Sequence, residues 1–321
     1  MVDFPKSVSI HEEGPREGFQ IEKNPIPTAR KIELVDALSL SGLKSIKIAS
    51  FVHPKIVPGM ADSEEVVAGI TAQPGVAYHG MWFNERGLAR AISTGRLDLK
   101  AGITMCASEV FLQRNKNRTQ DEDIATHHKL LDMYQRHGIE VSGVAVSSAF
   151  GCNFQGDVEF SYVLDLLARA LDIAAEHDVT IKNLALYDTM AWATPYQIKS
   201  AVGAVQDRYP QFELSLHLHD TRGMGIANAY AALEMGVAKF DACVGGLGGC
   251  PFAGHTGASG NVCTEDLAFL CDEMGIETGI DLEAILACAR LAEDIVGHPL
   301  PGSVMKGGSL RGLRDQIKSA A

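Results

Sequence analysis

The chain lacks several features that would assign it to a class at once. No apolar run approaches the length of about eighteen residues that a transmembrane helix needs, so we expect no membrane span. The opening residues, MVDFPKSVSIHEE, hold no apolar stretch and carry early acids, so we expect no signal peptide and a cytoplasmic location. The 7 cysteines are odd in number and unevenly spaced, which argues against a disulfide framework.

Positive charge is scarce as well. The 321 residues include 28 Lys and Arg against 40 Asp and Glu, a formal net charge of −12. Non-specific nucleic-acid binding needs clustered cations, so we expect no nucleic-acid partner. Disorder is excluded by an apolar content of 46%, and the residue in excess is glycine, with 32 copies.

Short β-branched runs alternate with segments of helical period along the chain. The expected strands are 7–12, 45–49, 76–82, 97–105, 140–147, 181–187, 213–219 and 239–244. The expected helices are 28–41, 63–71, 86–94, 122–137, 161–176, 195–208, 226–235 and 265–274, with Thr194 and Thr264 among the candidate caps and Gly42, Gly95, Gly138 and Gly236 as candidate helix ends.

This alternation matches a (β/α)8 TIM barrel in count and size, with a doubly wound sheet as the alternative. No Pro-rich or Ser-rich linker divides the chain, so we predict one domain over residues 1–321. The barrel would occupy about 7–280, and a C-terminal helix with a Gly-rich, basic tail would follow at 281–321.

Polar residues collect where the predicted strands end, which is where TIM barrels carry their chemistry. His217 and His219 are two apart on a strand and therefore project from the same face. With oxygen ligands from Glu17 and Asn261 they would suit an octahedral divalent ion. The alternative is a pair of hydrogen-bonded barrel histidines without a metal.

Other residues in these loops have two interpretations each. Cys250, between Gly249 and Pro251, is either a thiol that exchanges a proton beside the metal or a small buried side chain. Arg16 either holds an oxyanion or lies at the surface. The glycines of 245–249 match neither the dinucleotide fingerprint nor the P-loop, and they indicate close backbone approach to a ligand or a lid.

One local patch is basic on this acidic protein. The segment QRNKNR at 113–118 contains Arg114, Lys116 and Arg118. It would either meet an anionic ligand or be a solvated loop.

Four segments together resemble the HMG-CoA lyase family of metal-dependent lyase and Claisen-condensing barrels: EEGPREGFQIEKN, SFVHPKIVPGM, HLHDTRG and GGLGGCPFAGHTGASGNVCTEDL. The resemblance implies a TIM barrel that binds Mg or Mn. It also implies retro-Claisen cleavage of a 3-hydroxyacyl-CoA to acetyl-CoA and a keto acid. A homo-oligomer, specifically a dimer, is the expected assembly.

Roles are carried over by position. The resemblance assigns metal binding to Glu17, His217, His219 and Asn261. It assigns catalysis to Arg16, Cys250, His217 and Asp188, with Arg16 at the developing enolate oxygen, Cys250 as proton donor and Asp188 at the hydroxyl proton. We expect the substrate to contact Arg16, Gln20, Lys47, Ser50, Asn153 and Arg222.

The sequence also departs from the family. Glu17 stands where Asp is usual, Lys47 where Glu is usual on the second strand, and Arg222 where an uncharged aromatic is usual. The Cys250 loop is two residues longer and adds His255. Lys47 would either pair with Glu17, weakening or displacing the metal, or hold a substrate carboxylate.

Three functions therefore remain open at the level of sequence. The first is a lyase for HMG-CoA or a relative such as citramalyl-CoA. The second is a Claisen-type synthase or an aldolase acting on a free keto acid. The third is a metal-free paralogue in which Lys47 replaces the ion.

Overall fold

The computed structural model describes residues 4–248 and 260–320. Eight strands form one parallel sheet in the order β3-β2-β1-β8-β7-β6-β5-β4. Their bounds are β1 (Ser9–Glu12), β2 (Ser45–Ser50), β3 (Ala77–Met81), β4 (Lys100–Cys106), β5 (Glu140–Ser147), β6 (Asn183–Asp188), β7 (Glu213–Leu218) and β8 (Lys239–Ala242). The predicted strands are confirmed, with ends shifted by a few residues.

The sheet curls into a nearly closed TIM barrel. Its seam lies between β3 and β4, where Tyr78 N donates to Asp98 Oδ2 at 3.2 Å and Asp98 N donates to Tyr78 O at 2.7 Å. These bonds join β3 to the segment that precedes β4. The TIM barrel prediction is confirmed, and the doubly wound alternative is wrong.

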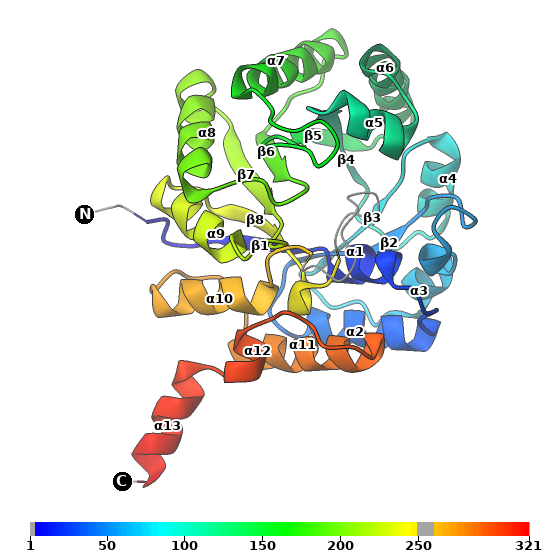
Figure 1. The fold of residues 1–321 in the computed structure, drawn as a ribbon. Coiled ribbons are helices and arrows are strands. Elements are labelled where there is room, and N and C mark those ends of the chain that lie inside the picture. Colours follow the sequence, from blue (N-terminus) through cyan, green and yellow to red (C-terminus); the bar gives the residue numbers. More distant parts are fainter. Residues whose placement is uncertain (1–3, 249–259, 321) are drawn as a thin grey trace.

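Helices surround the strands (Figure 1). The helices that follow the strands around the ring are α2 (Thr28–Ser39), α3 (Ser63–Gly69), α4 (Glu85–Ser93), α6 (Gln120–Arg136), α7 (Phe160–Glu176), α8 (Pro195–Arg208), α9 (Gly225–Glu234) and α10 (Thr264–Glu273). They correspond to the predicted helices. Sequence reasoning missed α1 (Gly14–Ile21), α5 (Glu109–Lys116) and the short turns η1 (Pro58–Met60) and η2 (Val244–Gly246).

Alternation along the strands separates the core from the barrel interior. In β7, Leu214, Leu216 and Leu218 are buried in the hydrophobic core. The register places His217 of β7 between Tyr187 of β6 and Asp241 of β8. Because residues two apart share a face, this row of polar side chains lines the barrel interior.

Most predicted helix ends are confirmed. Thr194 and Gln197 form a capping box at the start of α8. The glycines after α4, α6 and α9 have positive φ, as does Gly42 shortly after α2; the four values are 62° at Gly95, 63° at Gly138, 80° at Gly236 and 94° at Gly42. Thr264 is not a cap, because α10 begins at that residue and its hydroxyl donates to Glu12 Oε2 at 2.5 Å.

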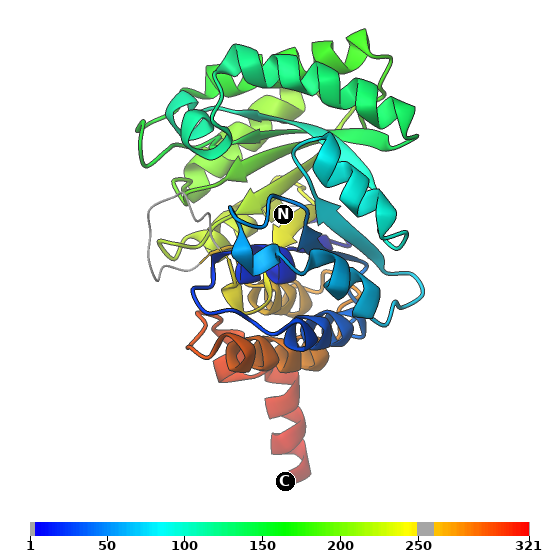
Figure 2. The ribbon, with the colours of Figure 1, turned by 90° about the vertical axis from the view of Figure 1, so that its right-hand side faces the viewer.

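Three more helices follow the barrel: α11 (Leu282–Val296), α12 (Val304–Gly307) and α13 (Leu310–Ala320). The predicted Gly-rich tail is therefore largely helical, and α13 extends away from the barrel (Figures 1 and 2). Its arginines pair with α10, Arg311 with Asp272 at 3.4 Å and Arg314 with Glu273 at 2.9 Å. Across the described parts of the chain, no helix is long and apolar enough to cross a membrane.

Candidate metal centre and active site

Helix α1 begins directly after β1 and carries Arg16 and Glu17 over the barrel. Pro15 occupies its first turn, where a missing backbone N–H costs nothing, and Glu17 N donates to Glu13 O at 2.8 Å. Residues 14–21, which follow the first predicted strand, therefore form a helix. The Pro and the acid in the first turn are helix-start signals that would have revealed it.

The acid Glu17, His217 of β7 and His219 directly after β7 form a compact ligand group. Candidate ligand atoms of Glu17, His217 and His219 all lie within 4.8 Å of one another. The two histidine Nε2 atoms are 3.1 Å apart, and His217 Nε2 is 4.0 Å from Glu17 Oε1. Two nitrogen ligands at right angles around one ion would be separated by a similar distance, about 3 Å.

Asn261 completes this group from the segment that follows β8. An isolated bridge joins it to His219, and Val262 N donates to Leu218 O at 2.9 Å. The Asn261 side-chain nitrogen donates to Glu17 Oε2. Its Oδ1 is buried and has no hydrogen-bond partner. The structure thus brings together all four predicted ligands, and the unpartnered oxygen fits a divalent cation bound by mixed oxygen and nitrogen donors.

Asp241 of β8 orients one of these ligands. Its Oδ2 lies 3.0 Å from His217 Nδ1, which leaves His217 Nε2 to face the cluster. Carboxylates commonly hold metal-binding histidines in this way. Sequence reasoning missed Asp241, although its position in the eighth predicted strand was available as a signal.

Charge and burial prepare the group for a cation. Burial raises the pKa of Glu17, but the charges of Arg16, His217 and His219 outweigh it and lower that pKa to about 2. Burial, and then the charge of His217, lower the pKa of His219 to about 3. Burial lowers the pKa of His217, but the hydrogen bond to Asp241 and the charge of Glu17 produce a net rise. An ionised carboxylate and a neutral imidazole are the forms that bind metals, so the pKa shifts of Glu17 and His219 favour cation binding, and His217 would release its proton when an ion binds.

Arg16 is buried beside the ligands, with 8% of its surface exposed. Its Nε donates to Glu13 Oε2 at 3.1 Å, and its Nη2 contacts Glu13 Oε2 and lies 3.0 Å from Glu17 Oε1. Burial lowers the pKa of Arg16, but the charges of Glu13 and Glu17 more than offset that and raise it. Arg16 therefore stays cationic at the edge of the ligand group, as an oxyanion-binding role requires.

Lys47 does not pair with Glu17. Its Nζ donates to Glu13 Oε1, and its side chain lines a cavity of about 230 Å³ inside the barrel together with His11 and His79. The expectation that Lys47 would displace the ion by pairing with Glu17 is therefore wrong. The reason is that Glu13, which was not among the predicted site residues, accepts from Lys47 and from Arg16, the partner of Glu17.

The loops after β5, β6 and β7 are bound to one another. Asp188 accepts from Trp192 N at 2.7 Å and Ala193 N at 3.1 Å, and burial raises its pKa to about 6. Asn153 Oδ1 accepts from Trp192 Nε1 at 2.7 Å. Arg222 donates to the backbone carbonyls of Met190 and Ala191 at 2.9 and 3.0 Å. Asn153 and Arg222 therefore join the three loops at the barrel mouth, and Asp188 fixes the conformation of the loop after β6.

Several polar atoms near the strand ends are buried without a protein partner. They include Gln20 Oε1 and Ser50 Oγ, both predicted to contact substrate, and Ser148 Oγ, which was not predicted. Ser148 directly follows β5 and has a φ of 53°, which is unusual for a residue with a side chain. Buried polar atoms normally have partners, so these three are candidates for ligand contacts.

Gly248 shows how closely the glycine-rich segment approaches the ligands. It has a φ of 95°, and a Cβ at that position would lie 2.8 Å from Glu17 Cβ and 3.3 Å from Asn261 Nδ2. Only glycine fits without displacing them, so the backbone approaches these two side chains closely, while the predicted approach to a ligand stays a prediction. Cys250 and His255 lie outside the described residues.

The basic patch at 113–118 is used within the fold. Lys116 Nζ lies 2.9 Å from Asp123 Oδ2, and Arg118 Nη1 lies 3.5 Å from Asp123 Oδ1. Arg114 stacks over the Phe154 ring at 4.2 Å. Of the two interpretations, neither a free anion site nor a solvated loop describes these contacts.

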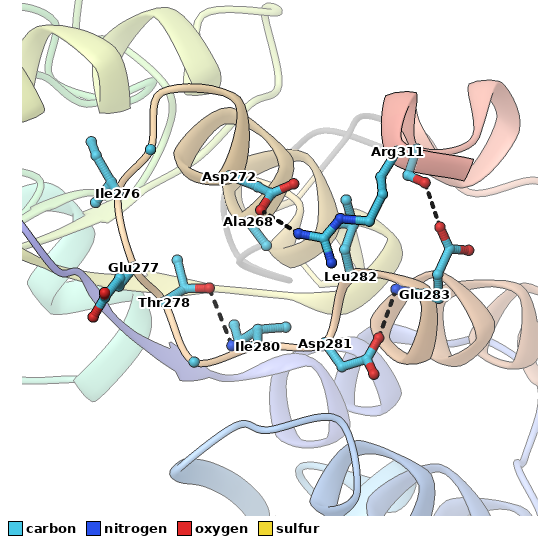
Figure 3. A pocket seen from close by; sticks show the side chains of 13 residues that line it. Ala268, Asp272, Ile276, Glu277, Thr278, Ile280, Asp281, Leu282, Glu283 and Arg311 are labelled. Atoms are coloured by element: carbon cyan, nitrogen blue, oxygen red, sulfur yellow. Dashed lines mark hydrogen bonds and ion pairs between the residues drawn. The ribbon is translucent and has the colours of Figure 1, made fainter. Parts of the chain in front are cut away.

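A cavity of about 610 Å³ lies away from this centre (Figure 3). Its walls are α10, the 275–281 loop and the start of α13, where Arg311 reaches Asp272 and Ser309 contacts Glu283. None of the predicted site residues that the structure describes lines it.

Fold and centre together define a TIM-barrel protein with a candidate divalent-metal site at the carboxyl ends of its strands. Residues 7–292 match the family model described as HMGL-like, and the chain belongs to that family. It is 37% identical over 298 residues to the hydroxymethylglutaryl-CoA lyase of Bacillus subtilis, covering 93% of this chain and 96% of that protein.

The names of two further relatives state a substrate or a bound ligand. The 3-hydroxy-3-isohexenylglutaryl-CoA/hydroxymethylglutaryl-CoA lyase of Pseudomonas aeruginosa is 40% identical over 296 residues, covering 92% of this chain and 95% of that protein. An HMG-CoA lyase from Acinetobacter baumannii, solved in complex with coenzyme A and 3-methylmalate, superposes with a TM-score of 0.85 at 37% identity, covering 96% and 97% of the two chains.

Proposed function

We propose that this protein is a divalent-metal-dependent carbon–carbon lyase. It cleaves 3-hydroxy-3-methylglutaryl-CoA, or a close relative of that thioester, to acetyl-CoA and a keto acid. The observation that carries the proposal is the ligand group of Glu17, His217, His219 and Asn261, with the unpartnered Asn261 Oδ1 and the Arg16 guanidinium beside it. Family membership and the coenzyme A complex of a relative support the thioester substrate.

The four ligands would hold Mg or Mn, since a carboxylate and an amide oxygen favour these cations and two imidazoles are compatible with them. A bound divalent ion would acidify the tertiary hydroxyl of the substrate and stabilise negative charge on its oxygens. Asp241 keeps His217 in the orientation that this binding needs.

The reaction removes the hydroxyl proton and breaks the bond between the hydroxyl-bearing carbon and the carbon next to the thioester. The hydroxyl oxygen becomes the ketone of the keto acid, and the bond's electron pair passes to the enolate of acetyl-CoA. Arg16 donates hydrogen bonds to the developing enolate oxygen. A proton then returns to the enolate carbon, a step that the resemblance gives to Cys250.

Asp188 is the proposed acceptor of the hydroxyl proton. Burial raises its pKa to about 6, close to the pH at which a general base works well. Each of its oxygens accepts one backbone N–H and retains a second lone pair. Gln20, Ser50 and Ser148 provide polar atoms for the acyl group or the thioester.

The metal-free alternative loses its basis, because the Lys47 nitrogen is on Glu13 and outside the ligand group. Lys47 and Arg222 both have protein partners, so neither by itself argues for a different acyl group. The cytoplasmic location and the dimer stay predictions.

A panel of thioesters tests the proposal. Purified protein is assayed for acetyl-CoA release from HMG-CoA, citramalyl-CoA and 3-hydroxyglutaryl-CoA thioesters with longer C3 substituents, and for cleavage of free hydroxy keto acids. We expect the HMG-CoA type to react fastest, with activity lost in EDTA and restored by Mg or Mn. Arg16→Ala should lower kcat by about a hundredfold or more, and Arg314→Ala on α13 is the control.

Two results would contradict the proposal. One is cleavage that persists at full rate after chelation and metal analysis show no divalent ion. The other is preferential turnover of a free keto acid over every thioester, which would favour the aldolase alternative.

A further inference from the structure

Glu13 is a buried carboxylate at the junction of β1 and α1, and only 1% of its surface is exposed. Three nitrogen-bearing side chains surround it. Its Oε2 accepts from Arg16 Nε and Nη2, and its Oε1 accepts from Lys47 Nζ and lies 3.2 Å from His11 Nε2. Burial raises the pKa of Glu13, but the charges of Arg16 and Lys47 hold it well below its usual value.

Arg16 has a second carboxylate partner. Its Nη2 lies 3.0 Å from Glu17 Oε1, the oxygen that also faces His217 Nε2. The guanidinium therefore lies between Glu13, which has no part in the ligand group, and Glu17, which belongs to it. The start of helix α1 sets this arrangement, since Glu13 is its N-cap residue and Arg16 follows three residues later.

The four charged side chains in this arrangement sum to no net charge. Glu13 and Glu17 supply two negative charges, and Arg16 and Lys47 supply two positive ones. A buried ion whose partner is removed is strongly destabilised and turns to the nearest opposite charge. If Glu13 lost its charge, Glu17 would be the carboxylate nearest to Arg16, and their attraction would strengthen.

We infer that Glu13 is a positioning residue for the proposed lyase reaction. Its carboxylate divides the Arg16 guanidinium between itself and Glu17, so that Glu17 stays available to a metal ion and Arg16 stays at the place where the enolate oxygen develops. Lys47 supports this role by neutralising the other oxygen of Glu13. The inference rests on the proposed function for its kinetic part and on the ligand group alone for its metal-binding part.

Glu13→Gln tests the inference, because it removes the charge and keeps the shape. The first measurement is Mn²⁺ affinity of the substrate-free protein by electron paramagnetic resonance. We expect the Mn²⁺ dissociation constant to rise about tenfold, since residues that orient ligands are worth about 10–100-fold. The second is steady-state kinetics at saturating Mn²⁺, where kcat should fall by about 10–100-fold while KM stays within about threefold.

A matched control separates positioning from general stability. Asp123→Asn neutralises another buried carboxylate that is held by Lys116, Arg118 and His127 on the outer side of the barrel. It should lower the melting temperature without changing Mn²⁺ affinity or kcat. Glu13→Asp keeps the charge with one methylene less, and its Mn²⁺ dissociation constant should lie between those of the wild type and Glu13→Gln, about threefold above the wild type.

The results of these measurements support or overturn the positioning role of Glu13 as follows. Unchanged Mn²⁺ affinity and kcat in a folded Glu13→Gln protein would overturn the inference. If Glu13→Gln fails to fold, Glu13→Asp decides: a dissociation constant about threefold higher supports positioning, and an unchanged constant overturns it. If no thioester is cleaved by the wild-type protein but the Mn²⁺ affinities follow the expected order, the proposed function fails and the metal-binding part of the inference stands.

Discussion

Two buried carboxylates in this barrel have nearly the same surroundings. Glu13 is held by Arg16, Lys47 and His11, and Asp123 by Lys116, Arg118 and His127 (a second cluster in which all distances are between 2.9 and 3.5 Å). In both, burial raises the pKa of the acid and neighbouring nitrogen groups more than reverse that. By local chemistry alone the two clusters would be assigned the same role.

The two clusters differ in the second contacts that their cationic side chains make. Arg16 continues from Glu13 to Glu17 and so to the ligand group. In the Asp123 cluster, Lys116 continues to the backbone carbonyl of Thr104 in β4, which ties α5 and α6 to the barrel. A buried ion pair is therefore functional or structural according to its second contacts.

The largest effect should come from removing a residue of the ligand group, which Arg16 connects to the Glu13 cluster. His219→Ala deletes one metal ligand, and the metal's contribution of several kcal/mol corresponds to roughly a thousandfold lower kcat/KM. Metal content by mass spectrometry and acetyl-CoA release measure it. His128→Ala, a histidine paired with His177 between α6 and α7, is the control and should leave both values unchanged.

Asp123→Asn should disrupt the Asp123 cluster and leave the Glu13 cluster intact. Removing one member of a buried ion pair costs roughly 3 kcal/mol, because it leaves Lys116 uncompensated. Urea denaturation at pH 7 measures the loss of unfolding free energy, and kcat should be unchanged. A clear fall in kcat with normal stability would place Asp123 in the active site and remove the contrast with Glu13.

Sequence reasoning reached the barrel because strand and helix periods are local patterns, and the four predicted ligands lie together in the structure. Strand and helix periods gave the element order, and the two-residue spacing of His217 and His219 fixed their common face. The helix α1 was not predicted, and it contains two glycines, Gly14 and Gly18, which are poor helix formers. Gly18 has a packing reason, since a Cβ there would lie 2.8 Å from Leu247 Cβ.

The charge pairing could not be predicted in the same way. Which of Glu13 and Glu17 meets Lys47 depends on the winding of α1 and on the register of β1 against β2, in which Glu12 faces Ile46. The contacts of Asn153 and Arg222 depend on loops from three strands meeting at the rim. Such contacts come from tertiary packing, for which a single sequence holds no local signal.

A smaller effect is expected at Gly248, where backbone contacts the ligand group directly. Gly248→Ala adds a Cβ 2.8 Å from Glu17 Cβ at a φ of 95°, so the ligand group must shift. We expect Mn²⁺ affinity to fall by about tenfold. Gly75→Ala is the matched control, because Gly75 has a φ of 79° with nothing within 4 Å of the added Cβ. It should cost about 1 kcal/mol of stability and leave Mn²⁺ affinity unchanged; equal losses of affinity in both variants would refute the explanation by contact.

The smallest expected effect is the pH dependence of the stabilisation that Asp123 provides. The pKa of Asp123 is lowered to about 2 from an ordinary value of 3.8, so its ionised form stabilises the folded state. Because the folded-state pKa is the lower one, this stabilisation is complete above about pH 4 and is lost as the pH falls toward 2. The difference in unfolding free energy between wild type and Asp123→Asn should therefore shrink between pH 4 and pH 2, as urea titrations at several pH values would show. Mn²⁺ affinity should show no difference between the two proteins at any pH where both are folded, since the ion pairs of Asp123 with Lys116, Arg118 and His127 do not reach Glu17. A difference that stayed constant down to pH 2 would mean that lost packing, and not lost charge, destabilises the variant.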